Sequence, residues 1–486
     1  MHLRTKAVAV LSVVALAVMG LAFAPAQRTA VAAESHRPNV LFIMMDDMRK
    51  DDLRWMPAVR SRIFAQGQTY RNHYAPTSLC CPNRWTALKG QYPRNHGVMA
   101  NTEPYGGFEG SQNNDGSTLS TWLAGSYYTG YVGKYLNGYE REIYVPPGWS
   151  DWQGSSCTYH FTQPCTNDNG IIVDDGAAYN EKVHTTRSID FIRSTNDGLF
   201  PYFLHTAYVT PHHGPPHNDG DEQVATPWVP PAYRGTYDGP RHVATPSFNE
   251  RDTSDKQGPV AKLPPLSASD LHELAIQTRQ RREALMATDA QIARLLNAVD
   301  ATGEATYVIF TSDNGNMLGD HRYPMGKTKP YEAASNIPLG IRGPGITPGS
   351  VYRGVTGTQD IAPSILNIAQ VPAPYELDGR NIIPPRDVLA NRGILLMSRE
   401  GPIDPEDGGA VIQAAEEPGW TYRGLVTQRW KLIRWPNQDG WELFDLTNDP
   451  DELVNLVNNP EYDAVEEQMK AHLDRLWNCS GRSCDL

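Results

Sequence analysis

The sequence carries little positive charge for its size. Its 486 residues include 43 Lys and Arg against 55 Asp and Glu, which gives a formal net charge of -12. Proteins that bind nucleic acid usually present a basic face, so this balance argues against nucleic acid as a partner. An anionic substrate is still compatible with it, because a local cluster of cations can hold an anion in an acidic protein.

Low-complexity segments and internal repeats are also missing. Gly (41 residues) and Pro (38 residues) are only moderately frequent, and 40% of the residues are hydrophobic, as in ordinary globular proteins. This composition excludes extensive disorder, coiled coil and collagen. At roughly 150 residues per domain, the length predicts two or three units, or one large α/β unit with an appendage.

Only the N-terminal region contains a long hydrophobic run. A basic start precedes the apolar residues 7–22, and small residues follow, with a plausible cleavage site at Ala32 or Ala33. We interpret residues 1–33 as a secretory signal peptide. A membrane anchor is the alternative, but the run is shorter than the ~20 residues of a typical span. We therefore expect a secreted, extracellular protein that has no membrane partner after cleavage.

The six cysteines suit an exported protein, in which disulfides persist. Two pairs close in sequence are each expected to form a local disulfide: Cys157 with Cys165, and Cys479 with Cys484. The other two, Cys80 and Cys81, are adjacent. Neighbouring cysteines rarely bridge, because the small ring departs from normal disulfide geometry. Cys80 and Cys81 therefore need another explanation.

Two apolar segments predict strands that are buried on both faces. They are residues 39–45, "NVLFIMM", and residues 306–312, "TYVIFTS", and such runs without alternation suit a parallel sheet. Each is followed directly by oxygen-bearing side chains: Asp46 and Asp47 after the first, Asp313 and Asn314 after the second. Ligands of open α/β sheets bind beyond the carboxyl ends of the strands. We therefore expect these four residues to form two walls of one site.

The four side chains offer only oxygen ligands, which suit a hard cation such as calcium or magnesium. No Cys and His cluster with zinc spacing is present. Taken singly, each pair is more simply explained as turn residues at a strand end. Two such pairs after two buried strands favour a metal site.

Between the two strands, Ser267 and Asp270 form a possible capping box. Apolar residues at helical spacing follow and predict a helix that ends near Gly303. Residues 214–265 are rich in Pro, Gly and Asp and predict a long, ordered surface excursion. Asp360 is a candidate cap for a further helix.

The chain changes character after about residue 390. The segments "GLVTQRWKLIRW" and "WELFDL" predict two strands separated by the turn-like "PNQDG". A helix over residues 462–476 follows, with apolar side chains on one face. We expect residues 391–486 to form a small C-terminal α+β domain.

The segment around the adjacent cysteines is "LCCPNRWTALKGQYPRNHGV". Pro82 is well placed for the first turn of a helix, which puts Cys80 at the helix N-terminus, where an anion is favoured. Arg84 follows Cys80 by four residues. On this motif alone, a small buried cysteine is an equally good interpretation.

Several motifs in order resemble the sulfatase family, in which the first Cys of a C-x-P-S/A-R motif is oxidised to formylglycine. They extend over nearly all of the chain after the signal peptide. The motifs are "NVLFIMMDD", the Cys80 motif, "GKYLNGY", "TPHHGPP", "TSDNG", "GKTKPYE" with "IPLGIRGPGI", and "ELFDLTNDPDE". One departure is Asn83, which stands where the motif usually has Ser.

The resemblance implies an alkaline-phosphatase-like α/β fold: a large mixed sheet flanked by helices over residues 38–390, and the small C-terminal α+β domain. It also implies one calcium ion per chain, with magnesium possible, bound by position 80 and the four oxygen-bearing residues: Asp46, Asp47, Asp313 and Asn314. A formylglycine-generating enzyme would be a partner during maturation. One hydroxyl of the formylglycine hydrate would attack sulfur. The second hydroxyl would then form the aldehyde again as sulfate leaves.

The resemblance further assigns roles to cations. Lys134 and Lys327 match lysines that hold sulfate oxygens, and Arg84 matches an arginine that steadies the formylglycine. His212 matches a histidine at the leaving group, where Lys327 is the other candidate proton donor. Three positions leave alternatives open. His213 could be the true equivalent of His212, His321 is equally well a core histidine, and Leu136 stands where arylsulfatase-type members have a histidine.

The sequence thus predicts a secreted sulfatase that hydrolyses sulfate esters to an alcohol and inorganic sulfate. "GKYLNGY" and "VPPGW" are more similar to N-acetylglucosamine-6-sulfatases and extracellular heparan-sulfate sulfatases. This branch suggests N-acetylglucosamine-6-sulfate or another sulfated glycan as the substrate. The alternatives are an arylsulfatase of broad specificity, a phosphodiesterase or phosphonate hydrolase on the same fold, and a non-enzymatic glycan-binding protein.

Overall fold

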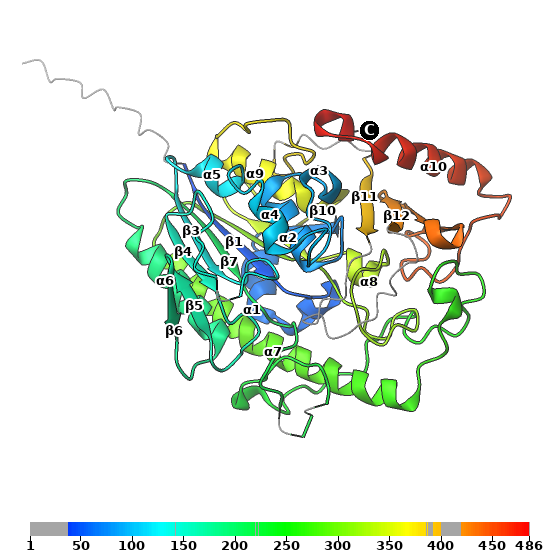
Figure 1. The fold of residues 1–486 in the computed structure, drawn as a ribbon, viewed down its shortest axis with the longest axis horizontal. Helices are drawn as coiled ribbons and strands as arrows, with labels where there is room; N and C mark the ends of the chain where they lie inside the picture. Colours follow the sequence, from blue (N-terminus) through cyan, green and yellow to red (C-terminus); the bar gives the residue numbers. More distant parts are fainter. Residues whose placement is uncertain are drawn as a thin grey trace, which may run out of the picture. The chain divides into compact units, whose positions relative to one another are not determined.

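The computed structural model describes residues 37–140, 142–218, 220–221, 223–384, 386, 392–399 and 419–485. The predicted signal peptide and the predicted domain boundary at residue 390 lie outside these residues. From Arg37 onward the chain forms one structural unit, shown in Figure 1.

A ten-stranded mixed sheet occupies the middle of this unit (Figure 1). Its strands are β1 (Asn39–Met45), β2 (Gln68–Tyr74), β3 (Tyr128–Gly133), β4 (Asp151–Ser155), β5 (Cys165–Asp168), β6 (Ile171–Asp174), β7 (Tyr202–Ala207), β8 (Thr306–Ser312), β9 (Leu339–Arg342) and β10 (Ser350–Gly357). The order is β10-β2-β9-β8-β1-β7-β3-β4-β5-β6. The centre, from β8 to β4, is parallel, while β9, β5 and β6 pair antiparallel.

The two strands predicted from apolar runs, β1 and β8, have the predicted limits and are direct neighbours in parallel register. All seven residues of β1 are buried. Alternate side chains of β1 enter two separate cores. Phe42 packs with residues from α2, α5 and α9, whereas Ile43 packs with residues from α6 and α7.

Helices cover both faces of the sheet (Figure 1). The helices of the described residues are α1 (Pro57–Val59), α2 (Cys80–Lys89), α3 (Pro93–His96), α4 (Gly107–Gln112), α5 (Leu119–Leu123), α6 (Asn180–Ser194), α7 (Ala268–Ala301), α8 (Glu332–Ser335), α9 (Ile361–Ala369) and α10 (Asp463–Trp477). Of these, α10 packs on the C-terminal sheet instead. In Figure 1, α2, α5 and α9 lie on one face of the sheet, and α6 and α7 lie on the other.

The predicted capping box begins α7: the Asp270 N–H donates to Ser267 Oγ at 3.1 Å, and the Ser267 N–H donates to the Asp270 carboxylate at 2.7 Å. The excursion over residues 214–265 contains two short 3-10 helices, Pro231–Tyr233 and Val260–Lys262. Asp360 precedes α9 as expected, but its side chain does not cap that helix: it accepts from the Gly357 N–H at 2.9 Å and pairs with Arg392 at 2.8 Å.

The C-terminal part is an antiparallel sheet followed by α10. Its strands are β11 (Ile394–Arg399), β12 (Trp420–Val426), β13 (Trp430–Trp435) and β14 (Gly440–Asp445). The prediction of one strand for "GLVTQRWKLIRW" was wrong. The chain turns within it, where the Thr427 N–H donates to the Trp430 carbonyl at 2.8 Å, and so the segment contributes to two strands.

Both expected disulfides are present, Cys157–Cys165 and Cys479–Cys484, while Cys80 and Cys81 are free and buried. Within the described residues, every helix is too short or too polar to cross a bilayer.

Candidate active site

The acidic pairs that follow β1 and β8 lie side by side, because these strands are parallel neighbours with Met45 opposite Ser312. The Asp47 N–H donates to Asp313 Oδ1 at 3.0 Å, and Asn314 Nδ2 donates to Asp47 Oδ1 at 2.6 Å. Asp47 has a left-handed backbone, with φ 64°. All four oxygen-bearing residues are buried, so the two pairs adjoin each other in the interior of the protein.

Cys80 is the first residue of α2 and is completely buried. Its Sγ lies 3.5 Å from Asp46 Oδ1 and 2.9 Å from Lys327 Nζ. Sγ is bonded to Cβ, the carbon that oxidation to formylglycine would convert to an aldehyde. The contacts of Sγ therefore mark the surroundings of the reacting group, which are anionic on one side and cationic on the other.

Three cations face the three carboxylates. Lys134 Nζ lies 2.5 Å from Asp46, and Lys327 Nζ lies 2.9 Å from Asp47. Arg84 Nε donates to Asp313 Oδ2 at 2.8 Å, and Arg84 Nη1 donates to the Lys134 carbonyl at 3.0 Å. Lys134 follows Gly133, whose φ of 103° and close approach to the Ala207 carbonyl exclude a side chain. Each lysine thus pairs with one acid, while Arg84 pairs with Asp313 and also lies 3.8 Å from Asp46.

These charges shift the titration of the carboxyl groups. Burial disfavours the ionised form of Asp46, but Lys134 and His212 hold its pKa below the usual range. Burial likewise opposes ionisation of Asp47, and Lys327 outweighs it and lowers the pKa. At Asp313, burial and the neighbouring Asp46 charge raise the pKa to about 6. Of the three carboxyl groups, only that of Asp313 is therefore incompletely stabilised in its ionised form by the protein's own cations.

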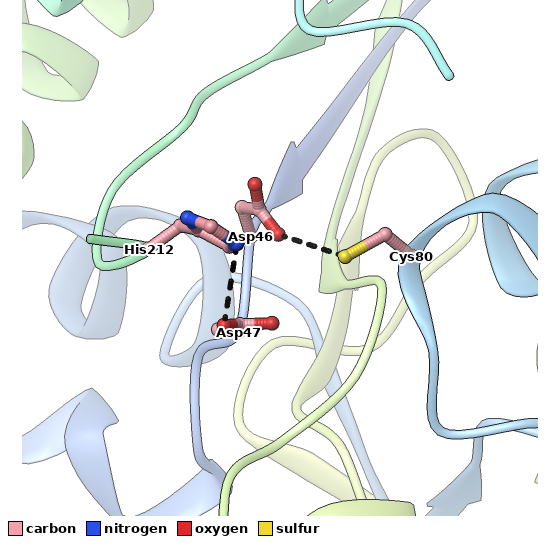
Figure 2. Close-up of side chains that lie close together, drawn as sticks. All are labelled: Asp46, Asp47, Cys80 and His212. Carbon is pink, nitrogen blue, oxygen red and sulfur yellow. Dashed lines mark hydrogen bonds and ion pairs between the residues drawn. The ribbon is translucent and has the colours of Figure 1, made fainter. Parts of the chain in front are cut away.

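His212 completes the cluster (Figure 2). One ligand atom from each of Asp46, Asp47, Cys80 and His212 lies within 4.8 Å of the others. His212 Nε2 is 3.9 Å from Asp47 Oδ2. Its Nδ1 lies 2.8 Å from the His213 carbonyl, which can only accept, so Nδ1 carries a hydrogen. The Nε2 atom thus faces the other three side chains.

The donor set fits a hard cation. Asn314 Oδ1 is buried and has no hydrogen-bond partner, and it belongs to a side chain that contacts Asp47. Buried polar atoms are nearly always satisfied, so such an atom indicates a missing partner. A cation bound by this oxygen and the nearby carboxylates would satisfy it. Oxygen donors of this kind suit calcium or magnesium.

The family model described as Sulfatase matches residues 38–371, well over half of the chain. The chain belongs to the sulfatase family. A second model, described as N-sulphoglucosamine sulphohydrolase, C-terminal, matches residues 414–478. Sulfatases are sulfuric ester hydrolases that typically use a metal and a formylglycine, and the buried cluster around Cys80 fits such an active site.

Two curated sulfatases are similar to the chain. The extracellular sulfatase SULF-1 homolog of Drosophila melanogaster is 30% identical over 368 residues, which are 74% of this chain and 32% of that protein. The N-acetylglucosamine-6-sulfatase of Homo sapiens is 27% identical over 502 residues, covering 93% of this chain and 87% of that protein. The chain thus spans about a third of the first relative and most of the second.

The fold agrees with solved structures. One was determined in complex with its substrate D-glucosamine-2-N,6-O-disulfate; it has a TM-score of 0.69 and 22% identity, and the match covers 90% of this chain and 97% of that one. The alkaline-phosphatase-like α/β fold, with a small C-terminal antiparallel sheet, is therefore confirmed.

The structure separates the histidines that the sequence left open. His212 lies in the cluster with Asp46, Asp47 and Cys80. His213 is half-buried and stacks on the His212 ring, with ring centroids 4.4 Å apart. His321 is elsewhere: its Nδ1 is 2.6 Å from Glu250, and its ring packs on Tyr331. His321 is thus a buried, paired core histidine. Leu136, which replaces the histidine of arylsulfatase-type members, packs in the hydrophobic core.

Sequence reasoning missed Tyr159, which packs beside two predicted site residues. Its ring lies 4.6 Å from that of His212, and Lys134 Nζ lies 4.9 Å from its centroid. Tyr159 belongs to the loop closed by the Cys157–Cys165 disulfide. Gly214 passes so near the Tyr159 carbonyl that a Cβ would lie 2.3 Å from it. Nothing local in the sequence signals this contact, because the loop and the His212 segment are far apart along the chain.

Proposed function

We propose that the protein hydrolyses sulfate esters to an alcohol and inorganic sulfate at the Cys80 site. The observation that carries the proposal is the position of Cys80 Sγ, between Asp46 and the amine of Lys327 at the N-terminus of α2. Formylglycine at this position would supply a hydrated aldehyde, whose oxygen is a nucleophile for sulfur and whose second hydroxyl allows sulfate to leave.

Lys134 and Lys327 are suited to hold the sulfuryl group. Their amines approach position 80 from different segments and are already paired with carboxylates at 2.5 and 2.9 Å. Preorganised cations of this kind stabilise the negative charge that develops on the sulfuryl oxygens. Arg84 contacts Asp313 and the Lys134 carbonyl, so its proposed role is to fix these groups and the first turn of α2.

Asp46, Asp47, Asp313 and Asn314, together with position 80, are the proposed ligands of one calcium ion, with magnesium as the alternative. A bound cation would polarise a sulfate oxygen and reduce the repulsion among the carboxylates. The unsatisfied Asn314 Oδ1 and the raised pKa of Asp313 support this assignment.

His212 is the proposed proton donor to the leaving alcohol oxygen, with Lys327 as the second candidate. The His213 carbonyl fixes the hydrogen on Nδ1, and Nε2 faces the cluster. A proton held at Nε2 would therefore be delivered on the side of the reacting group. The buried aromatic ring of Tyr159 packs against the imidazole of His212.

A sulfated sugar is the proposed substrate, with N-acetylglucosamine-6-sulfate or a glycosaminoglycan fragment as the most specific form of the proposal. The curated relative named N-acetylglucosamine-6-sulfatase supports it, as does the solved structure bound to a sulfated glucosamine. An arylsulfatase of broad specificity is the alternative. Aryl leaving groups need little protonation, so they report on the nucleophile without testing recognition of a sugar.

Secretion is proposed from the predicted signal peptide and is supported by the two disulfides. A formylglycine-generating enzyme is the proposed partner during maturation. The domain limits 38–390 and 391–486 are proposed from the change in sequence character, and the four-stranded C-terminal sheet supports them.

The test is the mass of the tryptic peptide that contains Cys80, together with kcat/KM for N-acetylglucosamine-6-sulfate, a nitrophenyl sulfate and the matching nitrophenyl phosphate or phosphonate ester. We expect an aldehyde or its hydrate at position 80, a thiol at Cys81, and a preference for the sulfate esters. Cys80→Ala should abolish turnover, whereas Cys81→Ala should retain the nucleophile.

Full activity with an unmodified Cys80 would falsify the nucleophile. Faster turnover of the phosphate or phosphonate ester would assign the protein to the phosphodiesterase or phosphonate hydrolase alternative. An unmodified Cys80 with binding of sulfated sugar but no turnover would indicate a glycan-binding protein. Rapid turnover of the aryl sulfate alone would favour the arylsulfatase.

A further inference from the structure

Arg281, in the middle of α7, contacts both halves of the candidate site. Its Nη2 donates to the main-chain carbonyl of Asp47 at 2.7 Å, and its Nη1 donates to the carbonyl of Pro211 at 2.9 Å. Asp47 is a proposed metal ligand, and Pro211 directly precedes His212. One planar side chain therefore joins the segment on the metal side to the segment that carries the proposed proton donor.

The contact fixes Asp47 where its backbone needs support. Asp47 is in the left-handed region, with φ 64°, which L-residues other than Gly seldom adopt without compensation. Its N–H donates to Asp313 and its carbonyl accepts from Arg281. The two bonds together hold the peptide units on either side of the residue, and so they set the direction of its carboxylate.

Arg281 is itself costly to bury. The side chain is 3% exposed, and both bonds from its guanidinium described above end on neutral carbonyls. Within the described part of the chain, the guanidinium makes no ion pair with a carboxylate. A buried charge without a close counter-ion is unfavourable. The nearby carboxylates of Asp52 and Asp47 supply only longer-range attraction.

Glu181 of α6 bonds to the residues just before His212. Its Oε1 accepts hydrogen bonds from the N–H of Val209 at 3.0 Å, the N–H of Thr210 at 2.6 Å and the Thr210 hydroxyl at 2.6 Å. Glu181 is fully buried. Glu181 thus contacts the turn before His212, including Thr210, and also His184. Arg281, in contrast, contacts both the turn and Asp47.

We propose that Arg281 is a positioning residue that couples the metal half of the site to the His212 half. The inference rests on the proposed function for the identity of the two halves. Figure 2 shows Asp47 and His212 approaching each other from different segments. Arg281 donates to the main-chain carbonyl of Asp47 and to that of Pro211, the residue before His212. Displacing its guanidinium should move the metal ligand and the proton donor together, whereas loss of Glu181 should move the histidine turn alone.

The experiment compares Arg281→Met with Glu181→Ala in the full chain. Calorimetry measures calcium affinity of the metal-free protein, and kcat is measured for an alkyl sulfate and for a nitrophenyl sulfate. For Arg281→Met we expect calcium affinity to fall about 10- to 100-fold, as for other groups that orient metal ligands. We also expect kcat to fall more for the alkyl sulfate than for the nitrophenyl sulfate.

For Glu181→Ala we again expect kcat to fall more for the alkyl sulfate than for the nitrophenyl sulfate. Calcium affinity should stay within about twofold of the wild type. Arg281→Lys can reach one carbonyl at a time and should partly restore calcium affinity relative to Arg281→Met. The lysine variant also preserves the test if the methionine variant fails to fold, because its calcium affinity should still lie below that of the wild type.

Unchanged calcium affinity in both Arg281 variants would overturn the coupling, as would an equal loss in Glu181→Ala. A wild type that binds calcium but hydrolyses no sulfate ester would overturn the proposed function alone, since the calcium measurement still tests Arg281. A wild type that binds no calcium or magnesium would overturn the proposed metal site and the coupling with it.

Discussion

The amine of Lys327 lies 2.9 Å from the thiol sulfur of Cys80, although the two residues are 247 positions apart in the sequence. The same amine lies 2.9 Å from Asp47. Lys327 therefore bridges the proposed nucleophile and a proposed metal ligand. Burial raises the pKa of the Cys80 thiol, and the positive charges of Lys134 and Lys327 oppose that rise.

Replacing Lys327 by methionine removes this bridge while retaining most of the side-chain volume. We expect kcat/KM for sulfate esters to fall about 100- to 1,000-fold, the size typical of losing one preorganised charge donor. Lys329→Met is the matched control, because Lys329 contacts Thr328 and the ring of Tyr323 rather than Cys80. Steady-state kinetics of both variants test the prediction, and equal losses would contradict it.

Removing the metal should abolish activity and lower the melting temperature. Without a metal ion, the repulsion among the buried carboxylates of Asp46, Asp47 and Asp313 is offset only by the amines and guanidinium that pair with them. Exhaustive chelation followed by readdition of calcium, magnesium or zinc gives the measurement. We expect calcium or magnesium, and not zinc, to restore turnover. Elemental analysis shows whether the preparation is free of metal. Full activity of a metal-free preparation would contradict the metal assignment.

His212→Ala should slow esters with poor leaving groups more than aryl esters, because only a poor leaving group depends on a proton donor. The expected loss is about 100- to 10,000-fold for an alkyl or sugar sulfate, the usual contribution of a general acid. His213→Ala is the matched comparison, since His213 stacks on His212 and the ligand cluster contains His212 instead. If the His213 variant shows the larger dependence on the leaving group, the two assignments are reversed.

Glu442 gives a prediction about stability and pH. Its carboxyl group accepts from Tyr331 at 2.9 Å and from the Gln257 N–H at 2.8 Å, and burial raises its pKa to about 7 from 4.5. Because the folded pKa is the higher one, the protonated group stabilises the fold below pH 4.5. This contribution is lost as the pH rises towards 7 and above.

The loss should amount to about 3 kcal/mol of unfolding free energy between these limits, at 1.36 kcal/mol per pKa unit. Denaturant unfolding at pH 5 and pH 8 measures it, with Glu442→Gln as the control that cannot ionise. We expect the wild type to lose stability relative to the glutamine variant on going to pH 8. A constant difference between the two proteins would show that Glu442 does not titrate in this range.

The sequence by itself determined the elements whose signals are local. The apolar runs gave β1 and β8 with their limits, because a strand buried on both faces needs no contact pattern beyond hydrophobicity. Pro82 placed Cys80 at the start of α2, and short spacing paired the disulfide cysteines. The motif order was enough to indicate the family, which the family model confirms, and it also predicts the side chains of the site.

Only the tertiary structure decided which of these side chains meet. It separated His212 from His321, which pairs with Glu250 in the core, and it brought Tyr159 against His212. It also showed Arg281 bonded to Asp47 and Pro211. Such contacts join segments tens to hundreds of residues apart, and they depend on how helices and loops pack on the sheet. A local sequence pattern does not specify that packing, although it does specify the start of a helix or the end of a strand.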